Sequence, residues 1–356
     1  MKLYGWPVSP YTQKVKSYLL TRRIPFQDVV PTGAMLRRTI QGAVGRVIMP
    51  TVQHDGGGWL QDSSVIIDWM EAHHPGDSIS PPAPRQRLAA LLIELFADEW
   101  LPMAALHYRW NIEENAAFVR AEFARYALPW LPGVLGRRLL EPMAGKMSGY
   151  LPLLGVTPET IPGLEASTEA LIAGLDVHLS EHAFLLGGRP CIGDFALYGP
   201  LWAHLFRDPG SRWLFDDAPF VRAWMARLET PAPLSGSFLA DDVVPESLDF
   251  LFRDLFAEQW PYIASIHRAI TAWLVDHPDA ERLPRSLGMT DFTLGGRVGQ
   301  RKLITAAAWM AQRPLDALAA APSAPTAWLE RVGGDDFLRT TPPARQVQRG
   351  FRLMLA

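Results

Sequence analysis

The segment YGWPVSPYTQKVKSYLL (residues 4–20) places two hydroxyl side chains, Ser9 and Thr12, where a short apolar run stops and a helical pattern begins. Serine followed by proline is typical of a helix start, with Ser9 as the capping residue and Pro10 in the first turn. The same geometry has a chemical use, because a hydroxyl beside the free N–H groups of a helix N-terminus can stabilise a bound thiolate. The residues alone leave both interpretations open.

No cysteine stands at this corner, and the only cysteine of the chain is Cys191. A serine cannot form a mixed disulfide, so the chemistry of a thiol reductase is disfavoured. A single cysteine also cannot form an intramolecular disulfide, which fits a reducing compartment.

Composition limits the partners and the location. The chain has 356 residues, 48% of them hydrophobic, and its 34 Lys and Arg against 37 Asp and Glu give a net charge of −3. Its length predicts two or three domains, and its charge offers no basic field for nucleic acid. Met1 and Lys2 lead directly into a predicted strand, and no apolar run has the length of a membrane span. We therefore expect a soluble cytoplasmic protein with no nucleic-acid or membrane partner.

The elements that position the corner follow from periodicity. Residues 2–6 and 24–30 are predicted strands, and residues 10–23 between them form a predicted amphipathic helix. Such a strand–helix–strand unit makes the two strands parallel. Residues 47–62 then predict two strands around a glycine-rich turn, and residues 63–76 predict a helix. This order is the thioredoxin-like arrangement.

Four motifs in order carry a resemblance to a known family. They are SPYTQKV (9–15), MPT (49–51), QDSSVIIDWME (61–71) and FLLGGRPCIGDFAL (184–197). With these motifs the chain resembles the cytosolic glutathione transferases, in particular their serine-type members. The resemblance implies an α/β thioredoxin-like N-terminal domain followed by an all-α domain. A further, mostly helical C-terminal segment is added here.

The resemblance gives the opening corner a role. It implies that glutathione is the co-substrate and that the hydroxyl of Ser9 donates to the glutathione sulfur. Thr12, one turn along the helix, is the alternative hydroxyl, and its structural role would be a local hydrogen bond to the backbone.

Two further positions are implied to bind glutathione. In the family the bond matching Met49–Pro50 is cis and turns the backbone toward the cysteine of glutathione; the residues alone also fit a trans proline in an edge strand. Asp62 and Ser63 stand at a helix N-terminus where the family holds the γ-glutamyl carboxylate. There, helix capping and ligand binding are compatible with each other.

Two other motifs are interpreted as structural. Asp194 is expected to cap a buried helix, although Cys191 replaces the usual hydroxyl of that capping box. HLSEH (178–182) formally matches a zinc-peptidase pattern, but we interpret its histidines as lying on a solvated helix face. We expect no metal site.

The predicted domains are residues 1–76, which bind glutathione, residues 86–230, which are all helical, and residues 247–356, a helical extension. Linkers are predicted at residues 75–85 and 230–247. The extension resembles a shortened, degenerate repeat of the helical domain, because LFADEWLPMAALHYRW pairs with LFAEQWPYIASIHRAI and FLLGGR pairs with FTLGGR, in the same order.

The resulting hypothesis is a glutathione transferase, expected as a homodimer, that activates the glutathione thiol to attack a hydrophobic electrophile. Trp100, Tyr108 and Trp110 are candidates to line the electrophile site or to be packed core. The alternative is a non-catalytic glutathione-binding or scaffolding protein with the same fold, favoured by the added segment and by any blockage of the site, for instance by Trp6.

Overall fold

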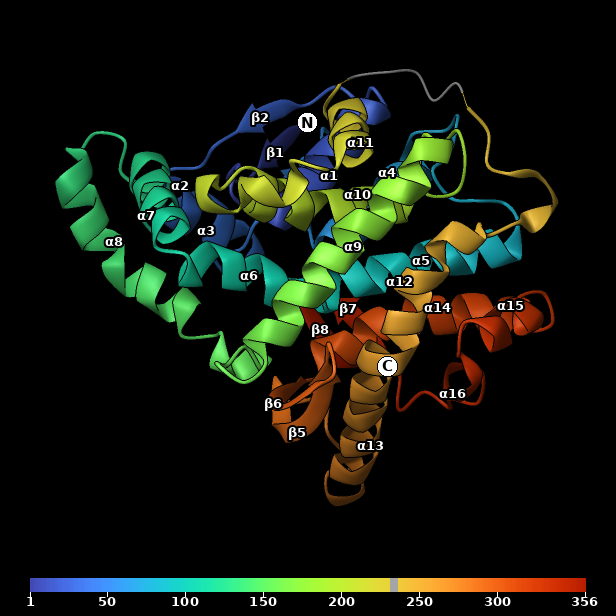
Figure 1. The fold of residues 1–356 in the computed structure, drawn as a ribbon. Coiled ribbons are helices and arrows are strands. Elements are labelled where there is room, and N and C mark those ends of the chain that lie inside the picture. Colours follow the sequence, from blue (N-terminus) through green and yellow to red (C-terminus); the bar gives the residue numbers. More distant parts are fainter. Residues whose placement is uncertain (231–235) are drawn as a thin grey trace. The chain divides into compact units, whose positions relative to one another are not determined.

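In the computed structural model of the protein, residues 1–230 and 236–356 are described. The chain divides into two compact units (Figure 1). The first unit comprises Met1–Ile79, Ala104–Tyr150 and Asp194–Gly236; the second comprises Ser80–Met103, Leu151–Gly193 and Ser237–Ala356. Helices of the predicted domain 86–230 occur in both units, and the three-domain organisation stays a prediction. Residues 231–235 of the predicted second linker lie outside the described residues.

A mixed four-stranded sheet forms the centre of the first unit. Its strands are β1 (Lys2–Tyr4), β2 (Gln27–Val29), β3 (Thr51–Gln53) and β4 (Trp59–Gln61), in the order β2-β1-β3-β4. β1 pairs parallel with β2 and antiparallel with β3, and β3 pairs antiparallel with β4. The predicted thioredoxin-like arrangement is confirmed.

Helices surround this sheet and complete the first unit. They are α1 (Pro10–Thr21), α2 (Gly33–Met35), η1 (Leu36–Ile40), α3 (Gln41–Val44), α4 (Ser63–His73), α6 (Pro102–Asn111), α7 (Glu113–Ala127), α8 (Gly133–Ser148), α10 (Ile192–Pro200), η3 (Leu201–Phe206), η4 (Pro209–Phe215) and α11 (Pro219–Glu229).

The core of the first unit joins the sheet to the helical segments. Val15 and Tyr18 of α1 are fully buried, because the helical period directs them to one face. The ring of Tyr18 meets Phe195 of α10 edge to face, with 5.7 Å between centroids. A Cβ atom at Gly199 would lie 2.5 Å from the carbonyl oxygen of Pro10, so α10 approaches the first turn of α1 closely. The helix that carries the corner is therefore packed against α10 at its first turn and again near its C-terminal end.

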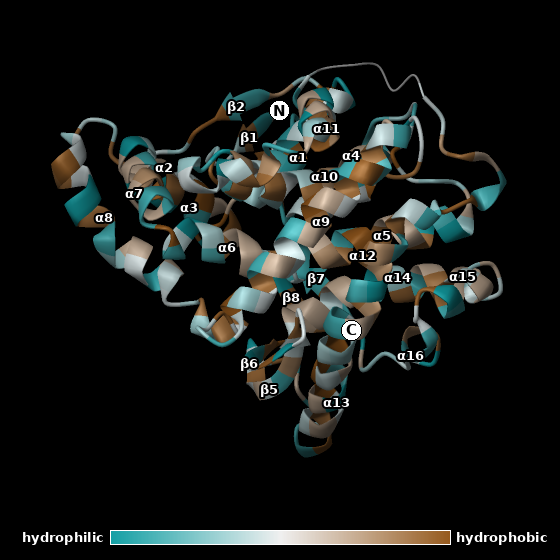
Figure 2. Cartoon of the chain, in the orientation of Figure 1, coloured by the Kyte–Doolittle hydropathy of each residue, from teal (hydrophilic) through white to brown (hydrophobic). Residues whose placement is uncertain are grey.

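The second unit is mostly helical. Its elements are α5 (Pro84–Glu99), η2 (Pro152–Leu154), α9 (Ile161–Glu181), η5 (Ala240–Asp242), η6 (Glu246–Leu248), α12 (Asp249–Asp254), η7 (Leu255–Gln259), α13 (Trp260–Asp276), β5 (Ser286–Leu294), β6 (Arg297–Ile304), α14 (Ala306–Ala320), α15 (Thr326–Arg331), α16 (Asp335–Leu338), β7 (Gln346–Arg349) and β8 (Arg352–Leu355). Hydrophobic residues follow stretches of α5 and α9 (Figure 2).

Two β-hairpins, β5–β6 and β7–β8, lie within the extension and were not expected from its sequence. FTLGGR (292–297) forms the turn of the first hairpin, with positive φ angles at Gly295 and Gly296. FLLGGR (184–189) instead lies in the loop before α10. This pair of segments therefore differs in structure, and it does not support the predicted repeat.

The interpretation of HLSEH as a solvated helix face is wrong for His178. This side chain is fully buried, and its Nδ1 lies 2.7 Å from the hydroxyl of Ser247. Burial lowers the pKa of His178 to about 4, so the ring is neutral near pH 7. Among the described residues no group of His, Cys, Asp and Glu is arranged to hold a metal ion.

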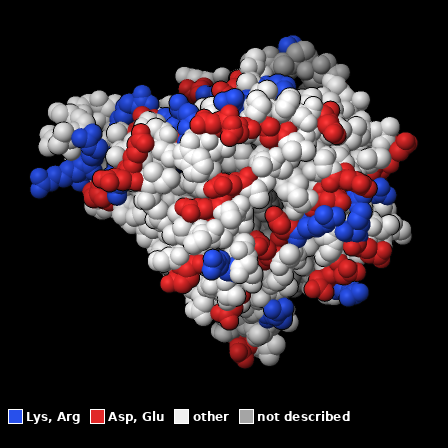
Figure 3. Space-filling view, in the orientation of Figure 1, with Lys and Arg blue, Asp and Glu red and all other residues white. Residues whose placement is uncertain are grey.

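Charge and hydropathy over the surface agree with the balanced composition. Acidic and basic side chains occur side by side on the face shown in Figure 3. No helix in the described parts of the chain is both long and apolar enough to cross a membrane.

Candidate active site

The strand register brings three turns of the first unit to one end of the sheet. Tyr4 at the end of β1 pairs with Thr51 at the start of β3, and Thr51 pairs with Gln61 at the end of β4. The residues after Tyr4, before Thr51 and after Gln61 therefore lie at the same edge. These residues contain the predicted site: the Ser9 corner, Met49–Pro50 and the start of α4.

Ser9 caps α1 as predicted. Its backbone is extended, with φ −90° and ψ 120°, and its Oγ accepts a hydrogen bond from the N–H of Thr12 at 3.3 Å. Pro10 occupies the first turn, where a missing N–H costs nothing. The side chain of Ser9 is partly exposed, and its hydroxyl proton has no acceptor among the described residues. The hydroxyl can therefore accept from the helix and donate to a ligand at once.

Thr12 differs from Ser9 in exposure. Only 1% of Thr12 is exposed, and its hydroxyl has no hydrogen-bond partner in the part of the chain that the structure describes. A Cβ atom added to Gly5 would meet the Thr12 side chain at 2.3 Å. Thr12 thus packs beneath the corner against the backbone that follows β1.

The Met49–Pro50 bond is cis, as the resemblance implies. Pro50 is buried and Met49 is partly exposed. The hydroxyl of Thr51 donates to the carbonyl of Ile48 at 3.0 Å and braces this turn. The backbone of Met49 is therefore held at the sheet edge beside the Ser9 corner.

Asp62 begins α4 and uses its carboxylate as the cap. Its Oδ1 accepts from the N–H groups of Ser64 at 3.0 Å and Val65 at 3.3 Å, and its φ angle is 82°. Ser63 is 5% exposed, and its hydroxyl makes no hydrogen bond within the described residues. The first turn of α4 thus keeps a hydroxyl for a further acceptor.

Lys14 was not identified from the sequence. It is 1% exposed, and its Nζ donates to the hydroxyl of Ser64 at 3.1 Å, which ties α1 to the start of α4. A signal was present, since Lys14 precedes the buried Tyr18 by four residues and shares its helix face. Arg46 hydrogen-bonds Gln61 beside the same turn.

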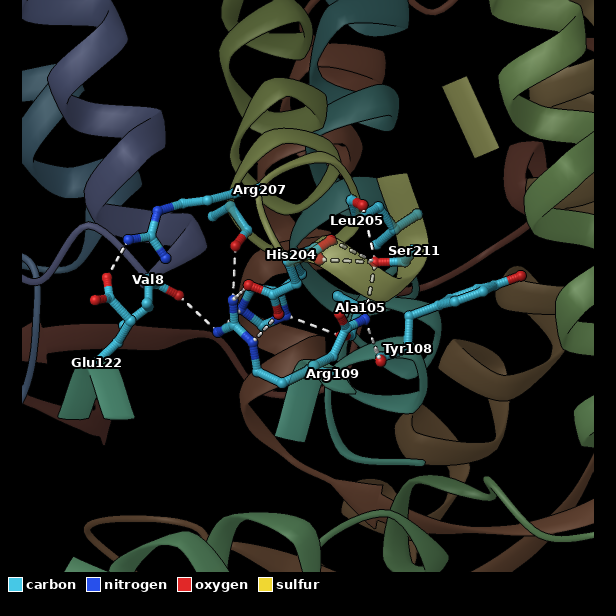
Figure 4. A network of polar contacts seen from close by, with 12 residues as sticks. Val8, Ala105, Tyr108, Arg109, Glu122, His204, Leu205, Arg207 and Ser211 are labelled. Atoms are coloured by element: carbon cyan, nitrogen blue, oxygen red, sulfur yellow. Dashed lines mark hydrogen bonds and ion pairs between the residues drawn. The ribbon is translucent and has the colours of Figure 1, made fainter. Parts of the chain in front are cut away.

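A buried polar network around Arg109 also reaches the corner, and the sequence did not reveal it (Figure 4). Arg109 is 2% exposed and forms a two-pronged ion pair with Asp208, which is fully buried. The same guanidinium donates to the carbonyl of Val8 at 2.7 Å. Burial lowers the pKa of Arg109 and raises that of Asp208, and their mutual attraction opposes both shifts.

A second group of polar residues lies beside this network. Glu122 accepts hydrogen bonds from Arg207 and from the hydroxyl of Tyr126. Burial alone would raise the pKa of Glu122, but the bonds from Tyr126 and Arg207 lower it below its ordinary value. Trp6 packs against Tyr126 and Phe123 with ring centroids 5.8 and 5.4 Å apart.

The side chain of Trp6 is packed in the interior of the first unit. It is 3% exposed, and its indole N–H donates to the carbonyl of Pro31 at 2.8 Å. The candidate lining residues Trp100, Tyr108 and Trp110 are also buried, with 4%, 2% and 8% exposed, and each therefore belongs to a packed core.

Comparison with known proteins identifies matches in two regions. Residues 3–78 match the family model "Glutathione S-transferase, N-terminal domain", and residues 158–227 match "Glutathione S-transferase, C-terminal domain". A curated "Glutathione S-transferase" of Pseudomonas putida is 32% identical over 85 residues, which is 24% of this chain and 37% of that protein. The match thus spans little more than a third of the relative's length.

Solved structures give weaker similarities. A glutathione S-transferase from Rhodospirillum rubrum is 14% identical with a TM-score of 0.43, covering 69% of this chain and 96% of that one. A glutathione transferase family member from Pseudomonas fluorescens, solved with bound glutathione, is 19% identical with a TM-score of 0.37, covering 65% and 99%. The domain matches carry the assignment instead. Residues 3–78 and 158–227 therefore match the two domains of the glutathione S-transferase family, in the family's order.

Proposed function

We propose that this protein is a glutathione transferase, in which the sheet edge of the first unit binds glutathione and Ser9 holds its sulfur as a thiolate. The observation that carries the proposal is the partly exposed Ser9 hydroxyl, which caps α1 and keeps its proton for a ligand. The match of residues 3–78 to the glutathione S-transferase N-terminal domain supports the choice of ligand.

In this proposal the other predicted residues bind the tripeptide. The backbone of Met49, fixed by the cis bond to Pro50, pairs with the cysteine residue of glutathione. The hydroxyl of Ser63 and the N-terminal end of α4 hold the γ-glutamyl carboxylate, since helix N-termini favour anions. Asp62 keeps that first turn in place through its two hydrogen bonds.

The reaction then needs only the thiolate and an electrophile. The sulfur forms a bond to an electrophilic carbon of a hydrophobic substrate, and the leaving group departs with its electron pair. Ser9 donates its hydrogen bond to the thiolate before the attack and lowers the pKa of the thiol from its usual value of about 8.5. We further propose that the protein is a cytoplasmic homodimer, which sedimentation analysis tests.

Calorimetric titration with glutathione, with thiolate absorbance followed against pH, tests the proposal. We expect binding in the wild type with a thiol pKa lowered by about one to two units, and binding with little lowering in Ser9→Ala. Thr12→Val is the matched control, and it should behave like the wild type because the Thr12 hydroxyl is buried. If the lowering of the thiol pKa were lost in Thr12→Val instead, Thr12 would be the activating hydroxyl.

A second candidate function is a glutathione-binding scaffold without turnover, favoured by the large added segment of residues 247–356. It predicts binding by the wild type with an unshifted thiol and no conjugation of electrophiles. Absence of glutathione binding by the wild type would overturn the transferase proposal.

A further inference from the structure

The geometry points to Arg109 as a positioning residue that sets the direction of the Ser9 hydroxyl from outside the thioredoxin-like region. This inference rests on the proposed function, because it gives Arg109 a part in stabilising the thiolate. Arg109 lies on α6 and is separated by 101 residues from Val8, whose carbonyl it binds.

The contact to Val8 controls the residue before Ser9. The Nη1 atom of Arg109 donates to the Val8 carbonyl at 2.7 Å. The peptide unit that joins Val8 to Ser9 contains this carbonyl, so its orientation sets the start of α1. The two other anchors are local: Gln13 of α1 donates to the carbonyl of Pro7 at 3.0 Å, and the Ser9 N–H donates to Trp6 at 2.9 Å.

All five N–H donors of Arg109 are engaged. Nε and Nη2 donate to the two carboxylate oxygens of Asp208 at 2.7 and 3.0 Å, and Nη2 also donates to the carbonyl of Ala203 at 2.6 Å. Nη1 donates to Nε2 of His204 at 2.6 Å and to the carbonyl of Val8. A planar fork with five donors is needed for this set, and a lysine has neither the shape nor the number of donors.

His204 fixes the orientation of the fork. Its Nδ1 lies 3.0 Å from the carbonyl of Ala105 and must donate to it, so its Nε2 accepts from Arg109. Burial lowers the pKa of His204 well below its ordinary value, and the charge of Arg109 lowers it further. The ring is therefore neutral near pH 7, and the arrangement does not change through the pH range of the thiolate titration.

The carboxylate partner is held equally firmly. Asp208 stands between η3 and η4, and the turn is braced by Asn115, which is fully buried. Asn115 donates to the hydroxyl of Ser211 at 3.0 Å and accepts from the N–H of Gly210 at 2.6 Å. The rigid helical framework of the first unit is thus connected through Arg109 to the Val8 carbonyl.

A small displacement of the corner should have a measurable effect on the thiolate. Hydrogen-bond donors act on a developing or bound anion only when they lie within about 0.5 Å of the productive position, and an error of about 1 Å can cost roughly a hundredfold in rate. Loss of the Val8 anchor leaves the Ser9 cap in place but no longer fixes the direction of its O–H group.

The test compares Arg109→Lys and Arg109→Met with the wild type by the thiol pKa of bound glutathione and its dissociation constant. We expect both variants to raise the thiol pKa by about one unit while the affinity at low pH changes less than about threefold. Amide hydrogen exchange in residues 8–13 should speed up in both. Arg109→Lys keeps the charge without the fork, so it separates charge from position.

Arg22→Met is the matched control. Arg22 forms a partly buried ion pair with Glu71 at 2.7 Å at the other end of α1, so its loss destabilises the same unit without touching the corner. We expect its thiol pKa to equal that of the wild type. If Arg109→Met does not fold, Asp208→Asn, which keeps the shape of the carboxylate, replaces it beside Arg109→Lys.

The outcomes distinguish this inference from the proposed function. Wild type that fails to bind glutathione overturns the proposed function and, with it, the role of Arg109. The other case is a wild type that binds glutathione with a lowered thiol pKa. If that pKa is equally low in Arg109→Lys and in Arg109→Met (or its replacement Asp208→Asn), only the positioning role is overturned. An equal shift in Arg22→Met also overturns that role, because it shows that general loss of stability moves the thiol.

Discussion

A methyl group added at Gly5 tests the packing beneath the Ser9 corner. The new Cβ atom would lie 2.3 Å from Cγ2 of Thr12, 2.4 Å from its Oγ1 and 2.9 Å from its Cβ. Neither side can move easily. The N–H of Gly5 is bonded to the carbonyl of Val29 at 3.1 Å, and Thr12 is 1% exposed in the first turn of α1.

The expected cost follows from this overlap. Overpacking a closed site typically destabilises a protein by about 1–3 kcal/mol, and the depth of the clash places Gly5→Ala near 2 kcal/mol. Thr12→Ala alone should be close to neutral. The cavity that it leaves lowers the free energy of unfolding by roughly 1 kcal/mol. It also removes a buried hydroxyl that has no hydrogen-bond partner within the described residues, and this gain is about as large as the cost of the cavity.

The double variant should then recover most of the loss, because the alanine methyl at residue 5 occupies the space left at Thr12. A tight contact to the Cβ atom of residue 12 stays, so recovery is incomplete. We expect a coupling energy of about 1–1.5 kcal/mol in a double-mutant cycle. Urea unfolding of the four proteins measures it. Gly5→Ala within about 0.5 kcal/mol of the wild type, or additive effects of the two changes, would refute this account of the packing.

Three further predictions concern the second unit. Burial raises the pKa of Glu258 to about 7, above the unfolded value of 4.5. The stability that the folded protein gains from protonated Glu258 is therefore fully present below pH 4.5 and is lost as the pH rises through 7. At pH 8, the free energy of unfolding of Glu258→Gln should therefore exceed that of the wild type by about 1–2 kcal/mol, after a discount for partial exposure. At about pH 4 the two proteins should unfold at the same urea concentration. Burial lowers the pKa of His267 to about 4. The stability that the folded protein gains from the neutral His267 ring is therefore fully present above pH 6.5 and is lost as the pH falls through 4. His267→Leu should keep its thermal midpoint between pH 7 and 5 while the wild type declines, and an equal decline would contradict this assignment. Oδ2 and Oδ1 of Asp242 accept from the N–H groups of Arg85 and Gln86, each at 2.9 Å, and Asp242→Ala should lose about 1 kcal/mol in urea unfolding. Asp242→Asn should lose part of this stability, because its amide keeps only one acceptor oxygen.

The thioredoxin-like region could be predicted because its signals are local. The helix predicted at residues 10–23 is observed at Pro10–Thr21, and the one predicted at residues 63–76 is observed at Ser63–His73. In both, the cap lies within three residues of the N–H that it binds. Sequence patterns record such contacts directly, because the two partners keep a fixed spacing along the chain.

The hairpins of the extension could not be predicted from local sequence patterns. β5 exposes residues on both faces at its start and contains Gly288, so it has no clean alternation of apolar and polar residues. Within the described residues β5 pairs only with β6. The similarity of FTLGGR to FLLGGR favoured a helical repeat, but the two glycines serve a hairpin turn in the second copy.

Arg109 marks the limit of sequence reasoning at the site itself. The capping bond of Ser9 spans three residues, whereas the Val8 carbonyl finds its donor 101 residues away. An arginine between Tyr108 and Trp110 in an amphipathic helix is usually solvated, and only the tertiary fold brings Asp208 close enough to bury it. The sequence thus predicts the Ser9 hydroxyl as the candidate group, whereas the contact from Arg109 to the preceding carbonyl is visible only in the fold. Two proteins with the same SPYT corner can differ in thiolate stabilisation if only one of them has this arginine, and the Arg109 variants test that consequence directly.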